Sequence, residues 1–321
     1  MKRRVFIQKA SLALSVPLVG YSILSCKSGS STADTTSETA AEGISEFGLQ
    51  LWTVKEDMAA DAKGTLKKVA DAGYAYIESF GGDKGIFWGM EPAEFKGYLD
   101  ELGLKIVASH IDSSYTTDES KEEEFKQLVA DASSIGIKYL INPFPGEYST
   151  RAEFDAVAAG LNRQGKIAKE KGIKMGYHNH HLEFMPLDDG SLAENVLIEN
   201  TDPELVDIEL DLYWVVKAGQ NPNEWLEKHG SRIKLCHVKD MLKEEKLSEI
   251  EKNEGPAEGF WPLGGSCVLG TGQIDFSEIL SVAKANGMEY YIVEQERFDN
   301  SSPLEDIVKN AEYMKSFTFA S

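Results

Sequence analysis

The feature that most constrains this chain is a short signal that recurs five times. A helical pattern ends in two residues and a glycine, and an apolar run with the character of a strand follows. The five glycines are Gly73, Gly103, Gly136, Gly172 and Gly287. Glycine is common just past the end of a helix, because it adopts the left-handed conformation there without steric cost. Strands that alternate with helices return to the same end of a sheet, so we expect a parallel sheet.

Eight apolar runs have the character of strands, and a helical pattern follows each of them. The expected strands are 47–52, 74–79, 105–110, 138–142, 172–180, 206–211, 233–238 and 290–294. The expected helices are 64–72, 93–102, 119–135, 151–171, 192–199, 223–228, 276–286 and 303–317. Segment 241–272 is rich in Gly, Glu and Pro and is expected to be irregular.

Eight parallel strands are the number that closes into a barrel. The predicted fold class is therefore α/β, with a single (β/α)8 TIM barrel domain over residues 45–321. An open, doubly wound sheet is the alternative architecture. No Gly-x-Gly-x-x-Gly follows the first strand, so the usual dinucleotide site of such a sheet is missing.

The first 25 residues have a different character. Basic residues at 2–4 precede an apolar stretch that is too short for a confident membrane span. The paired arginines predict a twin-arginine export signal, and residues 23–26 resemble a lipobox in which Cys26 is acylated. An ordinary N-terminal anchor helix is the alternative. Residues 26–44 are small and polar and are expected to form a flexible tether. We therefore expect an exported, periplasmic or cell-envelope protein that meets the membrane only through a lipid on Cys26.

The charge of the chain excludes some classes of partner. It carries 53 acidic and 33 basic residues. An acidic surface repels nucleic acid and anionic membranes, so a small neutral carbohydrate or a cation suits the chain better. Cys236 and Cys267 could pair in an oxidising compartment, but a buried free thiol is favoured for Cys236 because it lies in an apolar strand.

Polar and aromatic residues gather where the strands end, which is where barrels of this kind carry their active sites. If these were only the polar ends of core strands, Lys, Ser and Thr would be as frequent as Asp, Glu and His, and they are not. A single buried histidine is more often part of a core, and this alternative stays open for His110. The strand-end residues are Gln50 or Trp52, Glu78, His110, Asn142, His178 with His180, Asp211, His237 with Lys239, and Glu294.

Segment 177–184 holds half of the six histidines of the chain. Residues two apart on a strand point to the same side, so His178 and His180 are expected to face one place, with Glu183 in the following loop. We predict that His178, His180 and Glu294 act as catalytic acids or bases.

Substrate contacts are predicted from the remaining strand ends. Glu78, His110 and Lys239 are expected to bind substrate, although Lys239 could instead pair with Asp240. Tryptophans could provide stacking faces for a sugar ring. The candidates are Trp52, Trp88, Trp214 and Trp261, and Trp214 could equally belong to the core.

A mixture of imidazole nitrogens and carboxylate oxygens suits a divalent ion such as Mn²⁺, Co²⁺ or Zn²⁺, with Mg²⁺ possible, better than Ca²⁺. Such an ion can hold two neighbouring oxygens of a sugar and stabilise the enediolate that forms when a proton is removed between them. We therefore expect one divalent metal ion as cofactor.

The motifs resemble the xylose-isomerase-like barrel superfamily, often described as sugar phosphate isomerase/epimerase, over about residues 45–317. The resemblance lies in segments 177–184, 209–214, 237–240, 270–276 and 292–295. It implies a metal held by Glu183, Asp211, His237 and Glu294. The chain departs from the family epimerases at the tip of the fifth strand, where they have a glutamate and this chain has His178-Asn179-His180.

This departure leaves two questions open. His178 could be the first metal ligand instead of Glu183, and the His-x-His resembles the inosose dehydratases and 3-keto-sugar lyases or hydratases of the superfamily. The leading hypothesis is a metal-dependent isomerase or epimerase that removes a proton next to the carbonyl of a non-phosphorylated sugar or keto-sugar. The alternatives are elimination or hydration of a 3-keto-glycoside on the same metal site, and a non-catalytic sugar-binding lipoprotein. A barrel nuclease of the endonuclease IV type is disfavoured by the acidic charge.

Overall fold

The computed structural model describes residues 43–254 and 264–319. The predicted export signal, Cys26, nearly all of the predicted tether and Trp261 lie outside these residues. Within the described residues, no helix combines the length and apolar character needed to cross a membrane.

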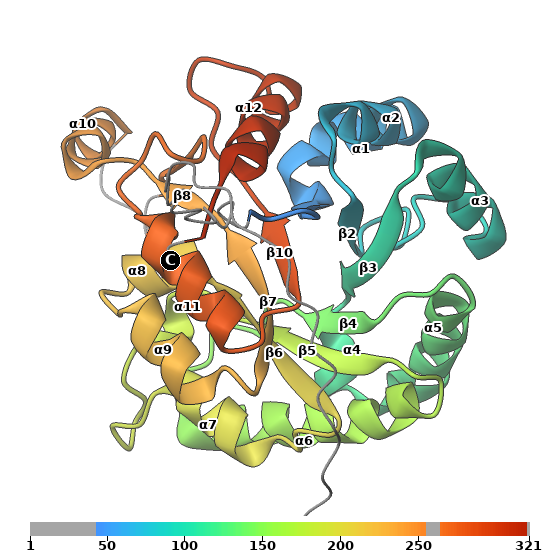
Figure 1. The fold of residues 1–321 in the computed structure, drawn as a ribbon. Coiled ribbons are helices and arrows are strands. Elements are labelled where there is room, and N and C mark those ends of the chain that lie inside the picture. The colour runs from blue at the N-terminus through green and yellow to red at the C-terminus, as the bar shows by residue number, and fades with distance from the viewer. Residues whose placement is uncertain (1–42, 255–263, 320–321) are drawn as a thin grey trace, which may run out of the picture. The chain divides into compact units, whose positions relative to one another are not determined.

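Eight parallel strands close into a barrel, as predicted (Figure 1). Around the barrel the order is β1-β10-β7-β6-β5-β4-β3-β2, so neighbours in sequence are neighbours in space except where the hairpin-like pair β8 and β9 intervenes. Three strands have the predicted bounds. The barrel strands are β1 (Gly48–Gln50), β2 (Tyr76–Phe80), β3 (Lys105–His110), β4 (Tyr139–Asn142), β5 (Lys174–His178), β6 (Val206–Asp211), β7 (Ile233–Val238) and β10 (Tyr290–Val293).

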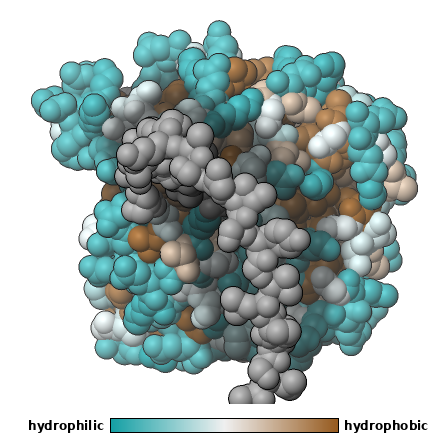
Figure 2. Space-filling view, in the orientation of Figure 1, coloured by the Kyte–Doolittle hydropathy of each residue, from teal (hydrophilic) through white to brown (hydrophobic). Residues whose placement is uncertain are grey.

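Each of the eight predicted helices is present, shifted by a few residues at most. All five glycines of the recurring signal have positive φ, between 71° and 96°, which confirms the helix ends inferred from them. Hydrophilic residues cover most of the outer helices on the face seen in Figure 2. The helices are α2 (Ala62–Ala72), α3 (Pro92–Leu102), α5 (Glu122–Ser134), α6 (Arg151–Lys169), α7 (Ala193–Asn200), α9 (Pro222–His229), α11 (Phe276–Ala285) and α12 (Pro303–Ser316).

Several short elements follow the strands, and only the one that begins the predicted helix 119–135 was expected. They lie mostly at the C-terminal ends of the strands, where they shape the candidate site. They are η1 (Leu51–Val54) and α1 (Lys55–Ala60) after β1, α4 (Ser114–Thr117) and η2 (Glu119–Lys121) after β3, η3 (Leu182–Phe184) after β5, and α8 (Leu212–Lys217) after β6. Trp52 thus lies in a turn, because the side chain of Gln50 accepts a hydrogen bond from the Trp52 N–H and ends the strand.

The prediction that segment 241–272 is irregular is wrong in part. It contains α10 (Glu244–Glu254) and contributes to an antiparallel pair of β8 (Asp240–Met241) with β9 (Ser266–Cys267). The Asp240 carboxylate accepts hydrogen bonds from four backbone N–H groups of residues 241–274, and this fixes the segment beside the barrel. Asp240 therefore does not pair with Lys239. Cys236 and Cys267 are both buried and free.

The barrel interior is built in layers. Inward-facing side chains form an apolar cluster of Tyr76, Val107, Ala108, Tyr139, Ile141, Leu235 and Ile292. The next inward-facing residues toward the strand ends are polar, because side chains on one face recur every second residue. Register then sets polar residues side by side across the sheet, as in His178 beside Glu209 and Asp211 beside His237.

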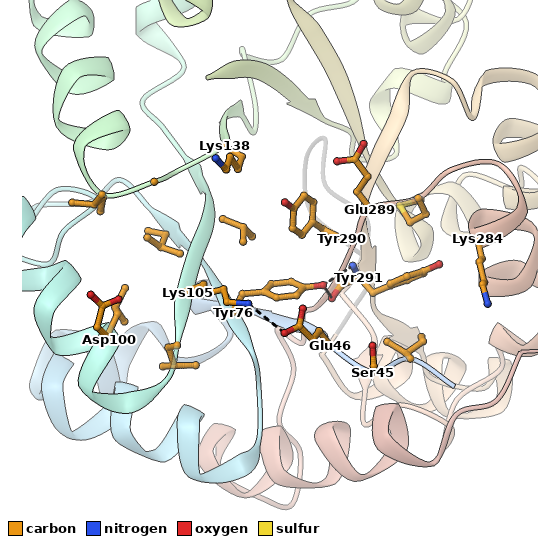
Figure 3. A pocket seen from close by; sticks show the side chains of 18 of the residues that line it. Ser45, Glu46, Tyr76, Asp100, Lys105, Lys138, Lys284, Glu289, Tyr290 and Tyr291 are labelled. Carbon is orange, nitrogen blue, oxygen red and sulfur yellow. Dashed lines mark hydrogen bonds and ion pairs between the residues drawn. The ribbon is translucent and has the colours of Figure 1, made fainter. Parts of the chain in front are cut away.

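A cavity of about 540 Å³ lies where the strands begin, at the opposite end from the predicted site. Figure 3 shows Tyr76, Tyr290 and Tyr291 at its centre, with Lys105 paired to Glu46 at 3.3 Å. It contains none of the strand-end residues singled out from the sequence.

Candidate metal centre and active site

A cavity of about 410 Å³ opens at the C-terminal ends of the strands. Its lining combines aromatic rings with imidazoles and carboxylates, as sites for small polar ligands commonly do. Six of the residues predicted from the sequence line it, namely Trp52, His110, His178, His180, Trp214 and Glu294. Phe80, Phe144 and Glu296 also line it and were missed.

Five other predicted residues are buried and do not line the cavity. Asp211 lies beside His178 and His237 lies beside Glu294, and both of these partners line the cavity. Glu78 and Lys239 are also buried, and their contacts with His237 and Glu294 favour a supporting role over direct contact with substrate. Glu183 is the fifth residue of this group.

His237 is the centre of a buried cluster of carboxylates and imidazoles. Its Nδ1 lies 3.1 Å from Glu294 Oε2 and 3.8 Å from Asp211 Oδ2. Its Nε2 lies 2.7 Å from Glu78 Oε2 and 3.3 Å from Glu209 Oε2. Burial opposes the charged imidazole, but Glu209 and Glu294 outweigh it and hold the pKa of His237 well above its usual value. In the absence of a cation, His237 therefore carries a proton.

Glu209 is a functional candidate that the sequence analysis missed. It is fully buried, and its Oε2 lies 2.9 Å from His110 Nε2 and 3.2 Å from His178 Nδ1. Burial opposes its ionisation, but His237 and the other two imidazoles hold the pKa of the Glu209 carboxyl well below its usual range. A signal for it was available, since Glu209 stands two residues before Asp211 on the same strand and so shares its face.

The pKa of the neighbouring Glu78 is shifted in the opposite direction. Burial and the negative charge of Glu209 raise the pKa of Glu78 to about 7. It accepts hydrogen bonds from Gln50 Nε2 at 2.8 Å and from the ring of His237. The two carboxylates therefore share the imidazoles unequally: Glu209 favours its ionised form, and Glu78 keeps its proton to higher pH than an ordinary glutamate.

The two candidates for the first metal ligand, His178 and Glu183, have different surroundings. His178 Nε2 lies 4.0 Å from Asp211 Oδ2, while its Nδ1 faces Glu209. Glu183 instead accepts hydrogen bonds from the Tyr177 hydroxyl at 2.6 Å and from the His180 N–H at 2.8 Å, one on each carboxylate oxygen. Of the set implied by the resemblance, Asp211, His237 and Glu294 come together, with ligand atoms within 4.8 Å of one another, and Glu183 is not among them. His178 is not in this group either, but it forms a second group with His110, Glu209 and His237.

The residues fit a bound divalent ion. Asp211 Oδ1 accepts a hydrogen bond from the Trp214 N–H at 3.0 Å, but its buried Oδ2 accepts none from the described residues. That oxygen lies 3.8 Å from His237 Nδ1 and 4.0 Å from His178 Nε2, too far for hydrogen bonds and suitable for atoms that bind a common ion. The buried cluster could therefore hold a metal ion.

Lys239 fixes the carboxylates at one side of the cavity. Its Nζ lies 3.1 Å from Glu294 Oε2 and forms an ion pair with Glu296. It also lies 5.2 Å from the ring centres of Tyr213 and Trp214. Burial lowers its pKa, but Glu294 and Glu296 outweigh this effect and keep the pKa of Lys239 well above its usual value. Lys239 therefore stays a cation that positions these two acids.

His180 is held neutral at the cavity. Burial, His178 and Lys239 together keep the pKa of His180 well below its usual value. Its ring centre lies 5.5 Å from that of Trp214 and 5.9 Å from that of Phe144. A neutral imidazole can accept a proton from a ligand in the cavity.

The aromatic lining suits a sugar ring. Trp52 is 38% exposed at the rim, whereas Trp214 is mostly buried and presents only part of its ring to the cavity. Trp214 thus belongs both to the core and to the lining, as the two alternatives from the sequence allowed. Flat apolar faces beside polar groups are suited to a ligand that has both C–H faces and hydroxyls.

Comparison with known proteins gives consistent matches. The family model described as xylose isomerase-like TIM barrel matches residues 66–317. An inosose dehydratase of Clostridium perfringens is 33% identical over 227 residues, which cover 70% of this chain and 69% of that protein. An inosose dehydratase of Mesomycoplasma hyopneumoniae is 35% identical over 275 residues, covering 78% of this chain and 87% of that protein.

Solved structures match the same barrel. A sugar phosphate isomerase/epimerase from Parabacteroides distasonis superposes with a TM-score of 0.70 at 28% identity, covering 84% of this chain and 98% of that chain. A D-allulose 3-epimerase from Methylomonas sp. has a TM-score of 0.61 at 18% identity, covering 86% and 99%, and this likeness concerns the fold alone.

Proposed function

The chain belongs to the xylose isomerase-like TIM barrel family, and from this premise we propose that it is a lyase acting on a non-phosphorylated keto-sugar. As a sugar-modifying enzyme of this family it removes a proton from the carbon next to a carbonyl, and then expels the substituent on the following carbon. One observation supports the choice of a lyase. His178 and His180 line the cavity at the tip of β5, whereas the Glu183 carboxylate accepts hydrogen bonds from the Tyr177 hydroxyl and the His180 N–H and does not line the cavity.

For the metal we propose His178 Nε2, Asp211 Oδ2, His237 Nδ1 and a Glu294 oxygen as ligands. The ligand atoms of Asp211, His237 and Glu294 lie within 4.8 Å of one another, and His178 Nε2 lies 4.0 Å from Asp211 Oδ2, which supports the set. The second nitrogens of His178 and His237 face Glu209, and such a carboxylate commonly fixes the orientation of a metal-binding imidazole. A set of two nitrogens and two carboxylates favours Mn²⁺, Co²⁺ or Zn²⁺. When bound, the ion supplies positive charge that stabilises negative charge on a substrate oxygen.

His180 is the proposed base. In its neutral form it accepts the proton from the substrate carbon, and in its protonated form it lies in the same cavity and returns the proton to the leaving oxygen. The C–H and C–O bonds break, a carbon–carbon double bond forms, and no oxidant is required. Trp52, Phe144 and Trp214 hold the ring and exclude water from this proton transfer.

The lining also supports a substrate without phosphate. Among the described residues that line the cavity there is no lysine or arginine, and Glu294 and Glu296 would repel a phosphoryl group. The buried Lys239 already donates hydrogen bonds to both of these acids, so its charge is not available to a phosphoryl group.

Isomerisation or epimerisation is the second candidate. It begins with the same proton removal and ends with the return of the proton to carbon. The likeness to the Parabacteroides distasonis sugar phosphate isomerase/epimerase favours it. A non-catalytic sugar-binding protein is disfavoured, because stacking residues alone would serve that purpose and this cavity also has a full set of ligand atoms.

The deciding experiment combines metal analysis with solvent exchange. Protein purified without chelator should hold about one divalent transition metal per chain. With a 3-keto-glucoside in D₂O, NMR should show loss of the leaving group together with deuterium exchange at the carbon next to the carbonyl. Exchange without elimination would favour the isomerase. A protein that holds no metal and catalyses no exchange would refute both the lyase and the isomerase.

His180→Ala tests the base directly. We expect it to keep its metal and to lose exchange and turnover by at least about 100-fold, because general base catalysis contributes that much. His181→Ala is the matched control, since this neighbouring histidine does not line the cavity. Full turnover in His180→Ala would contradict the assignment.

We also propose that the enzyme acts outside the cytoplasm, held by a lipid on Cys26. The basic start, the apolar stretch and the residues before Cys26 support this proposal. Labelling with a fatty-acid analogue should mark the wild type and not Cys26→Ala, and label on both would contradict a lipid at this residue.

A further inference from the structure

A smaller cavity of about 250 Å³ adjoins the candidate active site. The two cavities share Trp52 and Phe80 as lining residues, so these rings stand between them. Most lining residues of the smaller cavity belong to α1 and to the loop between β2 and α3, and Figure 1 shows where these segments lie in the fold. We call this smaller cavity the side cavity. None of its lining residues belongs to the proposed metal ligands, so the metal site does not explain why this cavity is present.

Three aromatic rings form one continuous wall of the side cavity. Trp52 packs edge-to-face on Phe80, and Phe80 packs edge-to-face on Trp88, with ring centres 5.0 Å apart in both pairs. Such pairs hold each other in fixed orientations. A rigid wall therefore runs from the candidate active site into the side cavity.

Trp88 is held in this wall at a conformational cost. Among the residues that the structure describes, it is the single non-glycine residue with positive φ, at 56°. Its indole N–H donates to Ser79 Oγ at 3.1 Å, and the Ser79 hydroxyl donates to the Ile86 carbonyl at 2.7 Å. A bulky residue rarely adopts this conformation, and residues that do are concentrated at functional sites. The geometry therefore points to a use for this ring.

The polar part of the lining carries no excess of either charge. Two lysines, Lys55 and Lys84, are matched by two acids, Glu56 and Asp83. Lys55 Nζ lies 3.9 Å from the centre of the Trp52 ring, and Lys84 Nζ donates to the Ala59 carbonyl at 2.7 Å. Ammonium donors and carboxylate acceptors beside aromatic faces suit a neutral ligand with several hydroxyl groups, since each hydroxyl both donates and accepts.

We propose that the side cavity binds a second sugar ring, so that the natural substrate is a glycoside of two rings. This inference rests on the proposed lyase function. The keto-ring lies in the candidate active site, and the ring to be released lies in the side cavity along Trp52 and Trp88. In a 3-keto-glycoside the proton leaves C2, the bond from C1 to the glycosidic oxygen breaks, and a C1–C2 double bond forms. The released sugar takes the proton on that oxygen, and no redox partner is needed.

The test compares a two-ring and a one-ring substrate. The substrates are the 3-keto derivative of a glucose disaccharide and free 3-keto-glucose. The double variant Glu56→Ala/Asp83→Ala removes two exposed acids of the side cavity, and Glu91→Ala removes an exposed acid nearby that does not line it. We expect the double variant to raise KM for the disaccharide about tenfold, as the loss of one to two hydrogen bonds implies, and to leave KM for 3-keto-glucose unchanged.

Trp88→Gly tests the aromatic wall, and glycine is chosen because it accepts the positive φ. It should also raise KM for the disaccharide and spare the one-ring substrate. Equal effects on both substrates, or no effect of either variant on the disaccharide, would overturn the side cavity as a sugar site while leaving the lyase function standing.

Failure of the lyase function has a different signature. If the wild type turns over neither substrate, saturation-transfer NMR with the unmodified glucose disaccharide and with glucose still tests the side cavity. Contacts to the second ring that disappear in Trp88→Gly would support it, and contacts that persist unchanged would refute it.

Discussion

The choice between His178 and Glu183 as metal ligand predicts opposite behaviour for two variants. His178→Ala removes the imidazole whose Nε2 lies 4.0 Å from Asp211 Oδ2 and whose Nδ1 faces Glu209. Glu183→Gln keeps the size of the side chain and removes its charge. If His178 is the ligand, His178→Ala should lose the metal and Glu183→Gln should keep it.

The structure sets the size of each effect. Losing a residue that only supports a ligand costs about 10–100-fold in metal affinity, so losing His178 itself should cost at least about 100-fold. In Glu183→Gln one oxygen can still accept from the His180 N–H, but the Tyr177 hydroxyl loses its carboxylate partner. Burial, which raises the pKa of Glu183, makes the charge itself costly, so the net loss should be about 1 kcal/mol. For a domain of this size that is about 2–4 °C in Tm.

Two measurements read these effects separately. Metal content by mass spectrometry, after dialysis against a fixed free concentration of Mn²⁺ or Zn²⁺, reports affinity, and thermal unfolding with and without the metal reports stability. His178→Ala should unfold at the same temperature with and without added metal. The reasoning is refuted if Glu183→Gln loses the metal at an unchanged Tm of the metal-free form while His178→Ala still binds it.

Three further predictions concern acids of the barrel. Burial and Glu183 raise the pKa of Glu194 well above the ordinary 4.5, so the folded protein keeps this proton to higher pH than the unfolded chain and loses stability as pH rises above that value. Glu194→Gln should therefore raise the free energy of unfolding in urea more at pH 8 than at pH 5, whereas the exposed Glu199→Gln should not. A ligand at 100 times its Kd stabilises the folded protein by about 2.7 kcal/mol, so chelation of the metal from the wild type should lower Tm by several degrees. Chelation should not shift the Tm of Asp211→Ala. Asp240→Ala leaves four backbone N–H groups without their acceptor and should lower the free energy of unfolding by at least about 2 kcal/mol, measured in the same urea titrations.

The fold was accessible from the sequence because its signals are local. A glycine after a helical pattern depends on the conformation of one residue, and the five such glycines were enough to define the repeating unit. The short elements after the strands were missed for a related reason. α8 begins where Asp211 caps it by accepting from the Trp214 N–H, and an acid at a strand end is equally compatible with a loop.

The membership of the site was only partly accessible, because it depends on contacts between distant residues. Glu209 lies 99 residues from His110, and no local pattern indicates that they meet at 2.9 Å. Glu183 shows the opposite difficulty: the turn η3 directs its carboxylate back onto the Tyr177 hydroxyl six residues earlier. Position in a motif therefore identified the right strand end without identifying which of its side chains faces Asp211.

The charge of the buried cluster is itself an argument for a cation. Five carboxylates meet one ammonium and three imidazoles there, and four of the five acids are almost fully buried. The five carboxylates are those of Glu78, Glu209, Asp211, Glu294 and Glu296. Carboxylates gathered in a low dielectric repel one another strongly, and the raised pKa values of His237 and Glu78 relieve only part of this repulsion. A divalent ion at Asp211 Oδ2 would relieve the rest and would free His237 Nδ1 of its proton, so binding of the metal should release protons. Proton release on titration with Mn²⁺ or Zn²⁺ in weakly buffered solution would measure this coupling, and binding without proton release would show that His237 Nδ1 is not a ligand.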